Sequence, residues 1–253
     1  MAGVERVTRP ALLVVYVHGF RSSPLSAKSR LISNALEPYF SKQQPMSGPL
    51  EPYSSSSGVK QPKSGVNHAT SSGRPDSAFQ VDFVSPQLPP SPKQSMALLE
   101  DLAVKNRDKD VCFVGSSLGG FYSTLLVERD IGDESRRWAL LLNPAIHPAK
   151  DLAAYVGEQT MWHKPEETYD FKREYIVELE EMEQELLGGL RHADRFSGLF
   201  CTGDEVIPWT DMVGRFGRGG NIRIVEGSDH GISDFDQHLP FVMDAILRRN
   251  QRG

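Results

Sequence analysis

This chain of 253 residues lacks several features that mark other classes of protein. Its two cysteines, Cys112 and Cys201, are too few for a disulfide framework, so we expect a reducing, cytoplasmic setting. The formal net charge of −5 is far from the basic excess of a nucleic-acid-binding protein. The longest apolar run near the N-terminus, residues 11–17, is too short to span a membrane. We expect neither a signal peptide nor a transmembrane helix.

Sequence spacings that hold metals or nucleotide cofactors are also missing. There is no HExxH or CxxC motif, and the glycine-rich segment 115–120 lacks the Lys-Ser/Thr ending of a phosphate-binding loop. We therefore expect no metal site and no cofactor. Hydrophobic residues make up 39% of the chain and charged residues 24%, an ordinary globular balance with enough apolar material for one substantial core.

Short apolar runs rich in β-branched residues alternate with segments that have helical spacing. Strands are expected at residues 11–17, 81–84, 111–114, 138–142, 196–201 and 222–225. Helices are expected at residues 26–39, at 95–105, after residue 117 and at 237–249. Continuous apolar strands that alternate with helices are typical of a parallel sheet covered on both faces. The sequence therefore predicts a single α/β domain over residues 1–253, with a six-stranded, mostly parallel sheet.

Two segments depart from this alternation. Residues 41–80 are rich in Ser, Pro, Gly and Gln and show no periodicity, which predicts a flexible surface insertion. Residues 150–193 contain a stretch, 169–190, in which apolar residues recur at spacings of three and four opposite a glutamate-rich face. We expect a helix there, either packed on the body or forming a small cap, because excursions from the carboxyl ends of strands lie over the site.

The sequence Gly115-Ser116-Ser117-Leu118-Gly119 has the G-x-S-x-G pattern and lies between an expected strand and an expected helix. At such a junction the chain turns sharply, and small residues two positions either side of the serine relieve the crowding. The turn would present the Ser117 hydroxyl at the edge of the sheet, above a helix N-terminus that favours negative charge. Ser116 is the competing hydroxyl, but it lies one residue before the apex and would be turned away. We expect Ser117 to be a nucleophile.

A serine nucleophile needs a base, and the base needs a partner that orients it. His230 directly follows the last expected strand, which places it in the loop layer above Ser117. Asp204 ends the fifth expected strand, and the order Ser, Asp, His along the chain is the one typical of α/β-hydrolases. Glu205 and Asp211 are the alternative acids.

The reaction also requires donors for the developing oxyanion. One should be the backbone N–H of Leu118, directly after the nucleophile. The second should come from the turn after the first strand, where the N–H of Phe20 is preferred and that of Arg21 is the alternative. The side chain of Arg21 is also a candidate for binding an anionic group of the substrate, although a solvated arginine is the commoner case.

A set of motifs spread over most of the chain resembles the bacterial YqiA-like esterases, in the same order. The motifs are YVHGFRSSPLSAKSRLI, SPQLPPSP, VGSSLGGFYSTLL, LLNPAIHP, TGDEVIPW and EGSDHGISDF. The resemblance implies an α/β-hydrolase fold, activity on acyl esters or acyl-CoA thioesters, and catalytic roles for Ser117, Asp204 and His230. Residues 41–80 have no counterpart in this pattern, and residues 161–193 are more elaborate than it requires.

These observations predict an enzyme that hydrolyses carboxylic esters of small to medium acyl groups through an acyl-enzyme. The expected partner is a small ester or thioester, with no nucleic acid and no membrane. An acyl-CoA thioesterase is the alternative enzyme, and an inactive hydrolase that serves as a binding scaffold is the alternative from another class. The sequence leaves the physiological acyl group and the oligomeric state open.

Overall fold

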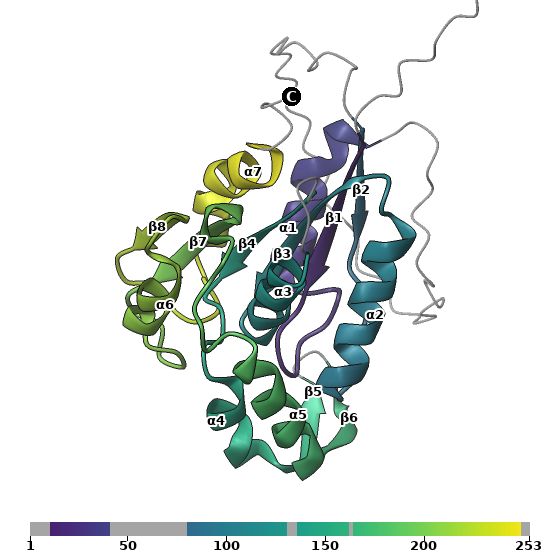
Figure 1. Ribbon diagram of the computed structural model, residues 1–253, viewed down its shortest axis with the longest axis vertical. Coiled ribbons are helices and arrows are strands. Elements are labelled where there is room, and N and C mark those ends of the chain that lie inside the picture. The colour runs from purple at the N-terminus through teal and green to yellow at the C-terminus, as the bar shows by residue number, and fades with distance from the viewer. Residues whose placement is uncertain (1–10, 41–79, 131–135, 162–163, 249–253) are drawn as a thin grey trace, which may run out of the picture.

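Six strands form one parallel sheet in the computed structural model, which describes residues 11–40, 80–130, 136–161 and 164–248 (Figure 1). The strands are β1 (Ala11–Val17), β2 (Gln80–Val84), β3 (Asp110–Ser116), β4 (Arg137–Leu142), β7 (Phe196–Cys201) and β8 (Asn221–Val225). Their order across the sheet is β2-β1-β3-β4-β7-β8, and neighbouring strands pair in parallel throughout. The predicted α/β class and the predicted six-stranded sheet are confirmed.

The apolar runs are continuous because both faces of the sheet are buried. In β1, Leu13 and Val15 point into one core cluster, whereas Leu12 and Val14 point into the other, as the period of two along a strand requires. All four side chains are at most 2% exposed. A strand with one solvated face would instead alternate apolar and polar residues.

The helices divide between the two faces. They are α1 (Ala27–Leu36), α2 (Pro92–Lys105), α3 (Leu118–Glu128), α4 (Pro148–Leu152), α5 (Arg173–Gln184), α6 (Trp209–Phe216) and α7 (Leu239–Leu247). Apolar residues of α1 and α7 pack on one face, and those of α2, α3 and α6 pack on the other. Helix α3 lies deepest, since all of its residues are buried.

Between β4 and β7 the chain builds a cap from α4, α5 and an antiparallel hairpin of β5 (Gly157–Met161) and β6 (Lys164–Phe171) (Figure 1). The prediction of a helix over residues 169–190 is therefore wrong at both ends, because α5 covers only Arg173–Gln184. Tyr169 and Phe171 belong to β6, and α5 begins only at Arg173. The helical spacing misled because Phe171 is buried at the end of a strand that runs almost directly into the helix, so the apolar stripe continues across the junction.

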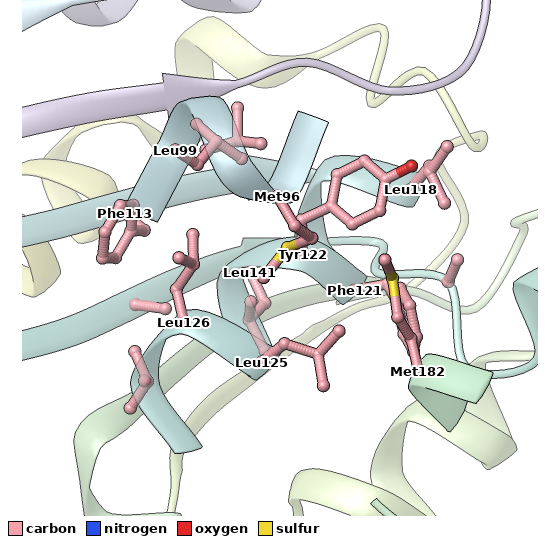
Figure 2. Packing of buried hydrophobic residues seen from close by; sticks show 14 of the residues in the cluster. Met96, Leu99, Phe113, Leu118, Phe121, Tyr122, Leu125, Leu126, Leu141 and Met182 are labelled. Carbon is pink, nitrogen blue, oxygen red and sulfur yellow. The ribbon is translucent and has the colours of Figure 1, made fainter. Parts of the chain in front are cut away.

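The cap is attached to the body by both polar and apolar contacts. Glu178 of α5 accepts hydrogen bonds from the Ser91 hydroxyl at 2.8 Å and from the Lys93 backbone N–H at 2.9 Å, at the start of α2. Met182 of α5 packs in the same buried cluster as Phe121 of α3 (Figure 2). Helix α5 therefore has a fixed position over α2 and α3.

Helix α6 was not expected from the sequence, and the last helix is shorter than predicted because a 3₁₀ turn, Phe235–His238, precedes α7. The predicted insertion at residues 41–80 lies outside the described residues except for Gln80, which opens β2. Within the described ranges, no helix is long and apolar enough to cross a membrane.

Candidate active site

The turn between β3 and α3 holds Ser117 in a conformation that few residues adopt. Its φ of 54° and ψ of −122° lie outside the backbone regions that non-glycine residues normally populate. The flanking glycines are required by close packing: a Cβ on Gly119 would lie 2.0 Å from the carbonyl oxygen of Val17, and one on Gly115 would lie 2.4 Å from the carbonyl oxygen of Gly119. Strain of this kind, on the order of 1–3 kcal/mol, persists where the surrounding structure enforces it.

Ser117, His230 and Asp204 come together at the carboxyl ends of β3, β8 and β7. The Ser117 Oγ lies 3.0 Å from Nε2 of His230, and Nδ1 of His230 lies 2.8 Å from Oδ2 of Asp204. A carboxylate can only accept hydrogen bonds, so Nδ1 of His230 carries the proton. Nε2 is then free to accept a hydrogen bond from the serine hydroxyl. This is the arrangement in which a serine hydroxyl can be deprotonated as it attacks.

The Asp204 carboxylate has no exposed surface and is fully engaged. Its Oδ1 accepts from the backbone N–H groups of Val206 and Ile207, each at 2.8 Å, which leaves Oδ2 for the histidine. The alternative acids are placed elsewhere. Glu205 accepts from the backbone N–H of His230 at 3.0 Å, and Asp211 lies in the first turn of α6.

The residues expected to supply the oxyanion donors come from α3 and from the turn after β1. Leu118 is the first residue of α3, so its N–H has no acceptor within the helix. In the turn after β1, Gly19 approaches so closely that a Cβ there would lie 3.0 Å from Cβ of Ser117, which brings the turn of Phe20 and Arg21 to the nucleophile. Arg21 itself has a φ of 58°.

The side chain of Arg21 is directed to the cap. Its Nε donates to the Thr160 carbonyl at 2.7 Å and its Nη2 donates to the Thr160 hydroxyl at 2.8 Å. The neighbouring Phe20 ring makes edge contacts with Tyr155 and Phe171, at centroid distances of 5.6 and 4.9 Å. The geometry therefore favours a role for Arg21 in holding the β5–β6 hairpin, rather than the substrate contact considered from the sequence.

A cavity of about 700 Å³ opens beside the turn of Phe20 and Arg21. Its walls come from the loops after β1 and β2, from α2, from the first turn and a half of α3, and from the β5–β6 hairpin. The volume is within the range typical of small-molecule sites. Leu118 and Gly19, the neighbours of Ser117, connect the cavity to the nucleophile.

The sequence matches the family described as "Uncharacterised protein family (UPF0227)" over residues 13–72 and 62–246. These segments include β1 from Leu13 onward, the strands β2 to β8 and the three loops that carry Ser117, Asp204 and His230. The chain belongs to the UPF0227 family. The resemblance to the YqiA-like esterases that the motifs indicated is thereby confirmed.

Solved structures with the same fold include several hydrolases. Est1E from Butyrivibrio proteoclasticus with bound ferulic acid has a TM-score of 0.58 at 13% identity, over 98% of this chain and 91% of that one. The esterase domain of a Rhodothermus marinus protein has a TM-score of 0.57 at 15% identity, over 96% and 89%. Mouse alpha/beta hydrolase domain-containing protein 10 has a TM-score of 0.56 at 12% identity, over 98% and 92%. At these identities the likeness shows that this UPF0227 member has an α/β-hydrolase fold.

One residue of this UPF0227 chain was missed by the sequence analysis. Asn143 is fully buried at the carboxyl end of β4, with a φ of 43°. Its Nδ2 donates to the carbonyl oxygens of Asp229 and His230, and its Oδ1 accepts from the N–H of Cys201. The available signal was its position, since a polar residue that directly follows a buried strand lies at the same edge of the sheet as the site.

A half-buried lysine also supports the histidine loop. The Nζ of Lys28, on α1, donates to the carbonyl oxygen of Gly231 at 2.7 Å. Burial lowers the pKa of Lys28 to about 8, while the negative charge of Asp229 acts in the opposite direction. The loop that presents His230 is thus anchored by both the sheet and α1.

Proposed function

We propose that this protein is a serine hydrolase that cleaves carboxylic esters of small to medium acyl groups through an acyl-enzyme at Ser117. The observation that carries the proposal is the continuous hydrogen-bonded path from Ser117 Oγ to His230 and on to Asp204, at 3.0 and 2.8 Å. Family membership and the esterases among the structural neighbours support the same reaction class.

In the proposed first step, Nε2 of His230 takes the proton of Ser117 as Oγ attacks the ester carbonyl carbon. The carbonyl oxygen becomes an oxyanion, which the N–H groups of Leu118 and Phe20 stabilise. Collapse of this intermediate breaks the bond to the leaving alcohol, which receives the proton from Nε2. The acyl group is then an ester of Ser117.

In the second half, a water molecule replaces the alcohol. Nε2 of His230 takes a proton from the water as its oxygen attacks the acyl carbon, and the same two N–H groups hold the second oxyanion. Collapse releases the acid and returns the proton to Ser117. Asp204 keeps the imidazole in the required tautomer and stabilises its positive charge in both halves.

The first experiment is labelling with a fluorophosphonate probe, followed by hydrolysis assays on p-nitrophenyl esters and acyl-CoAs of graded chain length. We expect labelling of the wild type, no labelling of Ser117→Ala, and higher kcat/KM on the esters. Higher kcat/KM on acyl-CoAs would make the thioesterase the better description. Absence of both labelling and hydrolysis would favour the inactive scaffold.

A further inference from the structure

Tyr122 occupies an unusual place for a phenol. It lies on α3 one turn after Leu118, its side chain is packed among the core residues, and only 2% of its surface is exposed. Tyr122 also lines the cavity beside the nucleophile. Figure 2 shows its ring next to Met96, with the hydroxyl directed toward Leu118.

The hydroxyl of Tyr122 makes no hydrogen bond with any residue that the structure describes, and it keeps some accessible surface, because Nδ1 of His238 is the one fully buried, unpaired polar side-chain atom among the described residues. Other buried hydroxyls nearby are satisfied: Ser95 in the same cavity donates to the Pro89 carbonyl at 2.8 Å, and Tyr16 accepts from Ser26 at 3.2 Å. Burial raises the pKa of Tyr122 above its ordinary value, so the phenol is a neutral donor. A hydroxyl that lines a cavity and has no protein partner pairs with water or with a bound ligand. A ligand oxygen in the cavity would pair it.

The cavity lies on one particular side of the nucleophile. In the proposed reaction the leaving oxygen must sit beside His230 Nε2, because it receives the proton from that atom. Among the described residues, none from the loops that carry Asp204 and His230 lines the cavity, whereas Phe20 and Leu118 do. The cavity is therefore on the side of Ser117 away from the leaving group, where the acyl group belongs.

We propose that Tyr122 determines acyl specificity by donating a hydrogen bond to an acceptor oxygen within the acyl chain. The substrates preferred by this site are then esters of acids that carry an ether, hydroxyl or carbonyl oxygen beyond the carboxyl group, rather than esters of pure hydrocarbon acids. The inference rests on the proposed function and adds the substrate class to it.

The test is a scan in which one methylene of the acyl chain is replaced by oxygen. The substrates are the p-nitrophenyl esters of hexanoic, propoxyacetic, ethoxypropanoic and methoxybutanoic acids, which have similar size and share one leaving group. For each, the ratio of kcat/KM to that of the hexanoate is compared between wild type and Tyr122→Phe, so that differences in intrinsic reactivity cancel. We expect one oxygen position at which this ratio falls about 3- to 10-fold in Tyr122→Phe, the range of a typical hydrogen bond.

Two controls make the result specific. Tyr175→Phe removes a phenol oxygen from the cap, outside the cavity lining, and should leave all ratios unchanged. The melting temperature of Tyr122→Phe should not fall, because no internal hydrogen bond is lost. A drop of more than about 2 °C would mean that the protein itself pairs the hydroxyl and would overturn the proposal.

Equal ratios in wild type and Tyr122→Phe at every oxygen position would also overturn it. Failure of the esterase proposal is recognised separately, by absence of hydrolysis of the hexanoate itself. In that case NMR titration of Ser117→Ala, with and without Tyr122→Phe, using hexanoic and the three ether acids, gives the same comparison without turnover. A Kd ratio that does not depend on Tyr122 would then refute the subsite.

Discussion

The side-chain amide of Asn143 lies 3.3 Å from the carbonyl oxygen of His230, so the end of β4 directly supports the loop that presents the histidine. The same amide donates to Asp229 at 3.1 Å, and its oxygen accepts from Cys201 in β7 at 2.9 Å. One buried side chain therefore connects three neighbouring strand ends. Because Asn tolerates a positive φ better than most residues, this position combines a backbone requirement with a hydrogen-bonding one.

Replacing Asn143 by glycine still allows the positive φ at this position but removes all three side-chain hydrogen bonds. We expect kcat to fall about 10- to 100-fold with little change in KM, because the histidine loop loses its support while the cavity is untouched. The free energy of unfolding should fall by about 2–4 kcal/mol, since buried backbone groups lose their partners. Steady-state kinetics and urea denaturation provide the measurements. Asn106→Gly, at the end of α2, is the control, and an unchanged kcat in Asn143→Gly would refute the positioning role.

Ser117→Ala and His230→Ala should each remove nearly all esterase activity, and the double variant should be no worse than either, because the residues act as a unit. Asp204→Asn should reduce kcat on the order of 10⁴-fold, as in serine proteases, where the amide holds the wrong tautomer. Glu205→Gln serves as the control, because that carboxylate contacts only the backbone N–H of His230 in the described structure. Full hydrolysis by Ser117→Ala would end the proposed mechanism.

Arg21→Lys should loosen the hairpin that covers the cavity. Lysine cannot reproduce the two-pronged contact of the guanidinium with Thr160, so we expect KM to rise several-fold and acyl-chain selectivity to broaden. The measurement is the kcat/KM profile over p-nitrophenyl esters of graded chain length, with the exposed Arg30→Lys as control. A loss of kcat/KM confined to substrates that carry a negative charge would instead indicate that Arg21 binds an anionic group of the substrate.

The lowered pKa of Lys28 predicts that the stability of the folded protein depends on pH. Its pKa is lowered from 10.5 to about 8 in the folded protein, so between these values the unfolded chain binds more protons than the folded one. Stability relative to Lys28→Met should therefore rise as the pH increases from about 8 to 10.5, by an amount on the order of 3 kcal/mol. Urea denaturation across this range measures the difference. Lys105→Met, on an exposed part of α2, should show no such rise, and a flat difference for Lys28→Met would contradict the assignment.

Much of the fold was readable from local sequence because the central strands β1, β3, β4 and β7 are buried on both faces. The run of residues 11–17 matches β1, and residues 196–201 match β7. A short, mostly apolar segment between helical segments is typical of a central strand of a parallel sheet. The placement of Ser117, Asp204 and His230 followed from the same strands. Each residue directly follows a predicted strand, and parallel strands bring their carboxyl ends to one edge.

The cap could not be read in this way. Strand β6 carries Glu166, Glu167 and Asp170, which are poor strand formers, and it is stabilised by its antiparallel partner and by the edge contact between the rings of Phe171 and Phe20. The contact between Phe20 and Phe171 joins residues about 150 positions apart in the chain, so no local pattern reports it.

The sequence by itself determined which residues stand at the ends of the strands, and hence which chemistry gathers at the edge of the sheet. Only the tertiary structure decided which residues hold the catalytic loops in place and which cavity lies beside them. Asn143 connects three strand ends, Lys28 donates to the histidine loop from α1, and Tyr122 lines the cavity beside the nucleophile. These roles depend on distances between segments remote in sequence, which follow from packing rather than from periodicity.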